Sequence, residues 1–229
     1  MKKWILLFVV IVCLGFSSKP VIVFDFGGVM IDFDRPQMIN WCCDSLSIEL
    51  DQIRAQRGRI NGELAIGAVE EGEFWQSVAE ENGVVFPQEW KKNFMESINR
   101  CKNRREEMFD LVRALRSSGY RVALFSDVTQ WQAETFRTAG DYVLFSPVVL
   151  SCEIGARKPN SESYAKLFNR LGVEAKECIF IDDRAENIEG ARKAGMRAIL
   201  FKTPGELKES LLGLGVQWTA DKYVKSEID

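Results

Sequence analysis

The chain has 229 residues, with 30 Lys or Arg, 33 Asp or Glu and no His, which gives a formal net charge of −3. The missing histidine excludes a Ser-His-Asp triad, a Cys-His dyad, a His-ligated zinc site and imidazole proton transfer. Acid–base chemistry near neutral pH would have to come from carboxylates, Lys, Tyr, Cys or metal-bound water. The length fits one large domain, or one domain with a sizeable insertion. The weakly acidic balance gives no sign of a nucleic-acid partner.

The beginning of the chain resembles a secretory signal peptide. Lys2 and Lys3 precede an apolar run over residues 4–16, and small residues follow it. The run is short for a bilayer span, whereas a basic start, an apolar centre and small residues are typical of a cleaved leader. We expect residues 1–17 to be removed and the protein to be exported, to the periplasm or the medium, without stable membrane association. The alternatives are a membrane anchor at residues 4–16 or a buried strand.

Short continuous apolar runs predict strands that are buried on both faces, as in a parallel sheet. Such runs cover residues 21–24, 121–125, 178–181 and 197–201, with a weaker fifth run at 142–145. Apolar residues at helical spacing lie between several of them. This alternation of strands and helices predicts an α/β fold, with an open parallel sheet and right-handed crossovers.

Residues 34–102 interrupt the alternation. This segment has no convincing strand and is typical of several helices, the first beginning near Asp34 and Pro36. It is too long for a simple crossover between the first two strands. We interpret it as an inserted α-helical cap, with residues 18–33 and 103–229 forming the core.

Acidic and hydroxyl side chains follow the predicted strands, at the edge where open parallel sheets bind ligands. Asp25 follows the first strand, Ser126 and Asp127 the second, and Asp182 and Asp183 the strand at 178–181. Clustered carboxylates repel one another unless a cation shares them, and a set of oxygen donors suits Mg²⁺.

A phosphate site can be built on the same edge. Lys158 precedes a predicted helix, and with Ser126 it could hold phosphate oxygens that a metal leaves free. Asp25 is the candidate nucleophile, because carboxylates form aspartyl-phosphate intermediates. Each residue alone is as well explained as a turn or helix-cap residue. The order of all four segments along an α/β chain is what indicates a site.

These segments resemble the motifs of the haloacid dehalogenase-like hydrolase superfamily, from about residue 21 to residue 214. They read VIVFDFGGVMIDFD, ALFSD, GARKPNSESY and IFIDDRAENIEGARKAGMRAI. Within the insertion, GAVEEGEFWQSV resembles the small helical cap of one branch of the superfamily. The first motif is most similar to that of bacterial sugar-1-phosphate phosphatases.

The resemblance implies a Rossmann-like core, Mg²⁺ as cofactor and a phosphoaspartate at Asp25. It implies catalytic roles for Asp25, Ser126 and Lys158, a phosphate site that also includes Asp127, and metal ligation by Asp25, the Gly27 carbonyl, Asp182 and Asp183. The expected function is a Mg²⁺-dependent phosphatase of small phosphorylated metabolites, for example sugar phosphates.

Two positions depart from the family pattern. Most phosphatases of the superfamily carry a second Asp, the general acid and base, where this chain has Gly27. Asp32 or Asp34 at the cap hinge could substitute, although hinge and helix-cap roles explain them more simply. Asp127 stands where this branch usually has Asn, and its charge would repel phosphate unless a metal or Lys158 compensates.

Two other functions stay open. A 2-haloacid dehalogenase uses the same Asp nucleophile without metal and also lacks the second Asp, but the Asp182-Asp183 pair favours a cation. The other alternative is a binding or interaction protein, because Gly27 and Asp127 could impair catalysis on an unchanged fold.

Overall fold

The structure is a computed structural model that describes residues 19–219. The predicted signal peptide over residues 1–17, and the alternative anchor at residues 4–16, lie outside the described residues. Of the helices that are described, none combines the length and apolar character needed to cross a bilayer.

Five parallel strands form the central sheet, in the order β5-β4-β1-β6-β7. They are β1 (Val21–Phe24), β4 (Val122–Ser126), β5 (Val148–Leu150), β6 (Cys178–Asp182) and β7 (Arg197–Leu200). Every residue of β1, β4 and β6 is buried, because helices cover both faces of the sheet. The predicted α/β fold with a parallel sheet is confirmed.

The strand predicted at residues 142–145 is wrong. These residues form a turn in which the Phe145 N–H donates to the Tyr142 carbonyl at 3.0 Å, and the remaining strand of the sheet is β5. Their rings are buried for another reason: Tyr142 packs 4.9 Å from Phe26, and Phe145 packs 6.3 Å from Phe24. A turn that supplies core side chains has the same apolar composition as a short buried strand.

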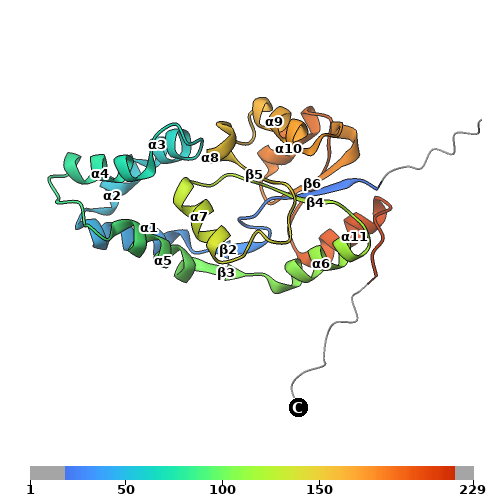
Figure 1. The fold of residues 1–229 in the computed structure, drawn as a ribbon, viewed down its shortest axis with the longest axis horizontal. Coiled ribbons are helices and arrows are strands. Elements are labelled where there is room, and N and C mark those ends of the chain that lie inside the picture. Colours follow the sequence, from blue (N-terminus) through green and yellow to red (C-terminus); the bar gives the residue numbers. More distant parts are fainter. Residues whose placement is uncertain (1–18, 220–229) are drawn as a thin grey trace, which may run out of the picture.

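Helices form a layer on each face of the sheet (Figure 1). Their bounds are α6 (Glu106–Ser117), α7 (Gln130–Thr138), α8 (Ser151–Ile154), α9 (Ser161–Leu171), the 3-10 helix η2 (Ala175–Glu177), α10 (Ala185–Lys193) and α11 (Pro204–Gly213). Leu111 of α6 and Leu207 of α11 belong to the apolar cluster on one face, and Tyr164 of α9 and Ile188 of α10 to the cluster on the other. Successive residues of each strand point to opposite faces of the sheet, so they belong alternately to the two clusters.

The segment between the first two strands of the sheet is mainly helical. It contains α1 (Arg35–Leu46), α2 (Leu50–Ala55), α3 (Arg57–Arg59), the π-helix η1 (Ile60–Leu64), α4 (Glu71–Glu81) and α5 (Trp90–Cys101). The antiparallel strands β2 (Ile31–Phe33) and β3 (Lys102–Arg104) lie at its two ends and pair with each other. Strands of three residues are too short to show a period, so the sequence did not predict them. We refer to residues 34–102 as the cap.

The cap packs against α7 of the core. The ring of Phe94 in α5 lies 5.5 Å from the ring of Trp131, and Lys91 forms an ion pair with Glu134 at 2.7 Å. Figure 1 shows the cap helices grouped on one side of α7 and the sheet on the other. At a second contact Gly67 has a φ of +67°, and a Cβ there would lie 2.2 Å from the Cys152 carbonyl oxygen. Only glycine allows the two backbones to approach this closely.

Candidate active site

Lys158 joins two buried carboxylates at the carboxyl edge of the sheet. Asp25 directly follows β1, and Asp182 ends the neighbouring strand β6. From the loop before α9, Lys158 Nζ donates to Asp25 Oδ1 at 2.8 Å, to Asp182 Oδ2 at 2.7 Å and to the Phe125 carbonyl at 3.0 Å. All three charged side chains are buried. The strand order therefore brings together three residues that are distant in the sequence.

The charges of this cluster perturb one another. Burial raises the pKa of Asp25 to about 7; the Lys158 ammonium opposes this shift and the Asp182 carboxylate adds to it. Burial alone would lower the pKa of Lys158, but the carboxylates of Asp25 and Asp182 raise it more strongly. Lys158 thus stays charged at neutral pH, and its charge is what makes two buried carboxylates tolerable.

Asp183 completes a group of carboxylates that fits a hard cation. One carboxylate oxygen each from Asp25, Asp182 and Asp183 can be chosen so that all three lie within 4.8 Å of one another. The Asp182 oxygens already accept hydrogen bonds from Lys158, from the Arg184 N–H at 2.8 Å and from Asn187 Nδ2 at 3.0 Å. Asp25 and the exposed Asp183 therefore have more free lone pairs for a metal. Three carboxylates beside one ammonium suit Mg²⁺ in both charge and donor type.

Gly28 sets how closely the loop after β1 approaches these carboxylates. Its φ is +80°, and a Cβ would lie 2.2 Å from Asp183 Oδ2. This role of Gly28 was not predicted from the sequence, although the Gly27-Gly28 pair after Asp25 is a visible signal of a close backbone approach. Gly27 differs, because its φ is not in the left-handed region and a Cβ there would meet no atom within 4 Å. The structure therefore has room for a side chain at Gly27, the position at which the second Asp is absent.

Ser126 ends the neighbouring strand β4 and Asp127 directly follows it, where the sequence predicts the phosphate site. Ser126 is buried at the end of β4. Asp127 Oδ1 accepts a hydrogen bond from the Lys158 N–H at 3.2 Å, and burial raises the pKa of Asp127, against the effect of Lys158. Arg157 Nε lies 3.7 Å from Asp127 Oδ2. The charge next to Asp127 thus comes from Arg157 as well as from Lys158, a contact that sequence reasoning missed.

Asp32 and Asp34 have partners outside this cluster. Asp32 lies on β2 and forms an exposed ion pair with Arg105, whose hydrogen bonds lower the pKa of Asp32. Asp34 accepts a hydrogen bond from the Gln37 N–H at 2.9 Å and caps α1. A carboxyl with a lowered pKa is a poor general acid near neutral pH. The hinge and helix-cap interpretations of these residues therefore fit the structure better than an acid–base role.

The fold and this group of side chains define a class of α/β proteins with an aspartate after the first strand and a helical cap inserted behind it. The family model described as haloacid dehalogenase-like hydrolase matches residues 19–195. The chain belongs to this family.

The sequence identity to individual relatives is low, or covers only part of the chain. The chain is 27% identical over 154 residues to flavin mononucleotide hydrolase 1 of Arabidopsis thaliana, covering 62% of this chain and 63% of the relative. It is 37% identical over 90 residues to glyceraldehyde 3-phosphate phosphatase of Methanopyrus kandleri, covering 38% and 39%. The matches thus span less than two thirds of these curated relatives.

A solved structure shows the same fold. It is a family enzyme from Bacteroides thetaiotaomicron in complex with magnesium and inorganic phosphate. Its TM-score is 0.68 at 22% identity, over 81% of this chain and 95% of that one.

Proposed function

We propose that the chain is a Mg²⁺-dependent phosphatase that hydrolyses small phosphorylated metabolites through a phosphoaspartate at Asp25. The observation that carries this proposal is the cluster in which Lys158 bridges Asp25 and Asp182, with Asp183 within 4.8 Å. The names of the two curated relatives, a mononucleotide hydrolase and a sugar-phosphate phosphatase, support the same reaction class. The magnesium and phosphate bound to the Bacteroides enzyme support the cofactor.

The side chains divide the reaction between them. Asp25 Oδ1 accepts from Lys158, so the other carboxylate oxygen of Asp25 attacks phosphorus as the bond to the leaving oxygen breaks. Lys158 and Ser126 bind the equatorial phosphate oxygens, whose charge grows in the transition state. Asp25, the Gly27 carbonyl and Asp183 would hold Mg²⁺, which would neutralise charge on the phosphate. A water then cleaves the acyl phosphate and restores Asp25.

Gly27 determines which substrates this site favours. No carboxyl stands two residues after Asp25 to protonate the leaving oxygen, and Asp32 and Asp34 have other partners. General acid help is worth roughly 10²- to 10⁴-fold in rate. Esters whose leaving group needs less help from a general acid, such as aryl or anomeric sugar phosphates, are therefore turned over faster than alkyl phosphates.

A hydrolysis panel tests the proposal. It uses p-nitrophenyl phosphate, glucose 1-phosphate, flavin mononucleotide and glyceraldehyde 3-phosphate, each with Mg²⁺ or with EDTA. We expect Mg²⁺-dependent phosphate release that falls on the order of a thousandfold or more in Asp25→Asn. Arg170→Gln, an exposed arginine on α9, is the matched control. Unchanged turnover in Asp25→Asn overturns the mechanism, and chloride release from 2-chloropropionate in EDTA would favour the dehalogenase.

A further inference from the structure

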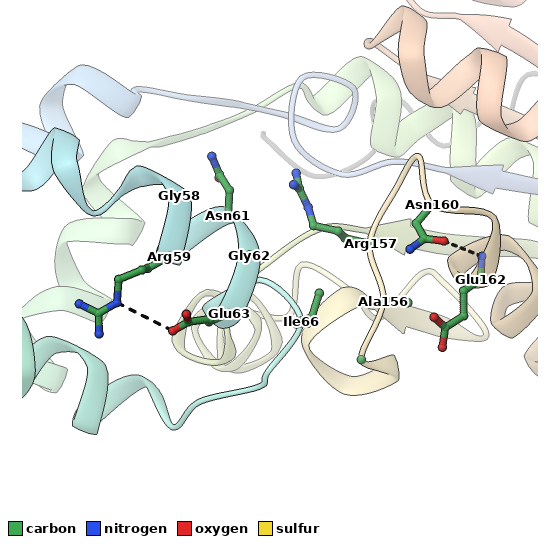
Figure 2. Close-up of a pocket in the computed structure, with 11 residues that line it drawn as sticks. Gly58, Arg59, Asn61, Gly62, Glu63, Ile66, Ala156, Arg157, Asn160 and Glu162 are labelled. Atoms are coloured by element: carbon green, nitrogen blue, oxygen red, sulfur yellow. Dashed lines mark hydrogen bonds and ion pairs between the residues drawn. The ribbon is translucent and has the colours of Figure 1, made fainter.

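A cavity lies between the cap and the loop that carries Lys158. Its volume is about 620 Å³, and Figure 2 shows its lining. The cap contributes the segment from α3 through the π-helix η1, and the core contributes the residues that flank Lys158 in the sequence. The charged or amide side chains in its wall are Arg59, Asn61 and Glu63 from the cap and Arg157, Asn160 and Glu162 from the core.

Most charges in this wall already have a partner. Arg59 forms ion pairs with Glu81 at 3.1 Å and with Glu63 at 3.8 Å. Glu162 is paired with Lys166 at 2.7 Å. Asn160 is occupied as well, because its Oδ1 accepts from the Glu162 N–H at the start of α9. These groups have little capacity left to bind a ligand.

Arg157 is different. Among the described residues its guanidinium donates no hydrogen bond, and the carboxylate within 4.0 Å of it is that of Asp127, whose Oδ2 lies 3.7 Å from Nε. Both atoms of that contact are buried and have no hydrogen-bond partner. The contact lies at the base of the guanidinium, so the two terminal nitrogens remain free. Figure 2 shows Arg157 extending to the same side as Asn61, with the carboxylates of Glu63 and Glu162 on the other side.

We propose that Arg157 binds a second anionic group, a carboxylate or another phosphate, on the leaving portion of the substrate. This inference rests on the proposed phosphatase function and narrows its substrate class. A planar guanidinium with free terminal nitrogens binds a carboxylate or phosphate through two parallel hydrogen bonds. Arg157 contacts Asp127, which directly follows Ser126 of the proposed phosphoryl site, so its anion site lies beside that site.

Kinetics on two substrates test this assignment. 2-Phosphoglycolate carries a carboxylate beside its phosphate, whereas p-nitrophenyl phosphate has no second anion. Arg157→Gln is expected to raise KM for 2-phosphoglycolate by about tenfold or more, since bonds to charged groups are strong. Its kcat/KM for p-nitrophenyl phosphate is expected to fall by a smaller factor than that for 2-phosphoglycolate, because only the unpaired charge of Asp127 then affects it. Arg157→Lys keeps the charge but not the planar pair of donors, and is expected to restore only part of the loss. Arg170→Gln, exposed on α9, controls for removal of an arginine.

A binding measurement separates this inference from the proposed function. Asp25→Asn in Mg²⁺ is titrated calorimetrically with 2-phosphoglycolate and with methyl phosphate, which lacks the carboxylate. We expect 2-phosphoglycolate to bind about tenfold more tightly, and the added Arg157→Gln substitution to abolish the difference. Equal binding of the two compounds, no binding of either, or a preference that survives Arg157→Gln would overturn the assignment. Failure of the wild-type protein to hydrolyse any ester would overturn the phosphatase proposal alone.

Discussion

Lys158 is the residue on which the electrostatics of the site depend. Its ammonium is the only positive group hydrogen-bonded to Asp25 and Asp182 among the described residues. Replacing it with an apolar side chain would leave two buried carboxylates facing each other. Removing one partner of a buried ion pair usually costs about 3–5 kcal/mol.

We therefore expect Lys158→Met to lower the free energy of unfolding by about 3–5 kcal/mol at neutral pH. Urea denaturation followed by circular dichroism measures this change. Lys166→Met is the control, because Lys166 also lies beside the loop but forms a half-exposed pair with Glu162. Equal stability of Lys158→Met and the wild type would contradict the interpretation that Lys158 compensates the buried carboxylates.

Gly27 allows the opposite kind of test, a gain of function. Its φ is not in the left-handed region, and a Cβ there would meet no atom within 4 Å. Gly27→Asp would place a carboxyl two residues after the nucleophile, where most phosphatases of the superfamily have their general acid and base.

We expect Gly27→Asp to raise kcat for alkyl phosphates by about 10²-fold, the lower end of general acid help. The rate for p-nitrophenyl phosphate is expected to change little, since its leaving group needs no proton. Steady-state kinetics on both substrates measure the contrast, with Gly27→Asn as the uncharged control. An equal increase in Gly27→Asn would contradict proton transfer as the cause.

At the scale of elements, α4 of the cap is attached to α7 of the core by a buried carboxylate. Glu71 Oε2 accepts from the Trp131 N–H at 2.7 Å, and Oε1 accepts from Thr129 Oγ1 at 3.0 Å. These donors are at the start of α7, where backbone N–H groups lack partners within the helix. Glu71 has no exposed surface, and burial raises its pKa to about 7, against the effect of these hydrogen bonds.

This pKa predicts a pH dependence of stability. Between pH 4.5 and 7 the unfolded chain releases the Glu71 proton and the folded chain keeps it, so folding loses stability as pH rises. At pH 8 the raised pKa of Glu71 lowers the free energy of unfolding by about 3 kcal/mol. Glu71→Gln removes the titrating carboxyl and with it this pH-dependent loss of stability. We expect its free energy of unfolding to rise relative to the wild type by up to that amount between pH 4.5 and 8.

Urea denaturation at several pH values checks this expectation. Glu73→Gln is the matched control, because Glu73 is an exposed glutamate in the same first turn of α4. A difference between Glu71→Gln and the wild type that does not change with pH would contradict a buried, titrating Glu71. Asp25 also has a raised pKa. Its effect on the free energy of unfolding is the same in the wild type and in Glu71→Gln, so it does not change the difference between them.

At the scale of the whole molecule, the proposed metal site couples ligand binding to folding. A cation that binds only the folded chain raises its stability by mass action, by about 2.7 kcal/mol at a hundred times Kd. We expect millimolar Mg²⁺ to raise the Tm of the wild type relative to EDTA, and to leave Asp183→Asn unchanged. Thermal denaturation measures both. Asp44→Asn, an exposed residue of α1, is the control, and no Mg²⁺ effect on the wild type would contradict the site.

The sequence alone was sufficient for β1, β4 and β6, because strands buried on both faces are continuous apolar runs. It also predicted β7, although β7 is an edge strand that is only partly buried. It also predicted the positions of Asp25, Ser126, Asp182 and Asp183, since each lies at or directly after the end of such a strand. The run at 142–145 misled because core packing of rings, and not a strand, accounts for its composition.

Only the tertiary structure decided which distant side chains meet. Lys158 and Asp25 are 133 residues apart, and the contacts Arg157–Asp127 and Glu71–Trp131 join segments with no shared local pattern. Local periodicity reports which face of an element is buried. It carries no information on the partner across the interface, which depends on how the cap and the core pack in three dimensions.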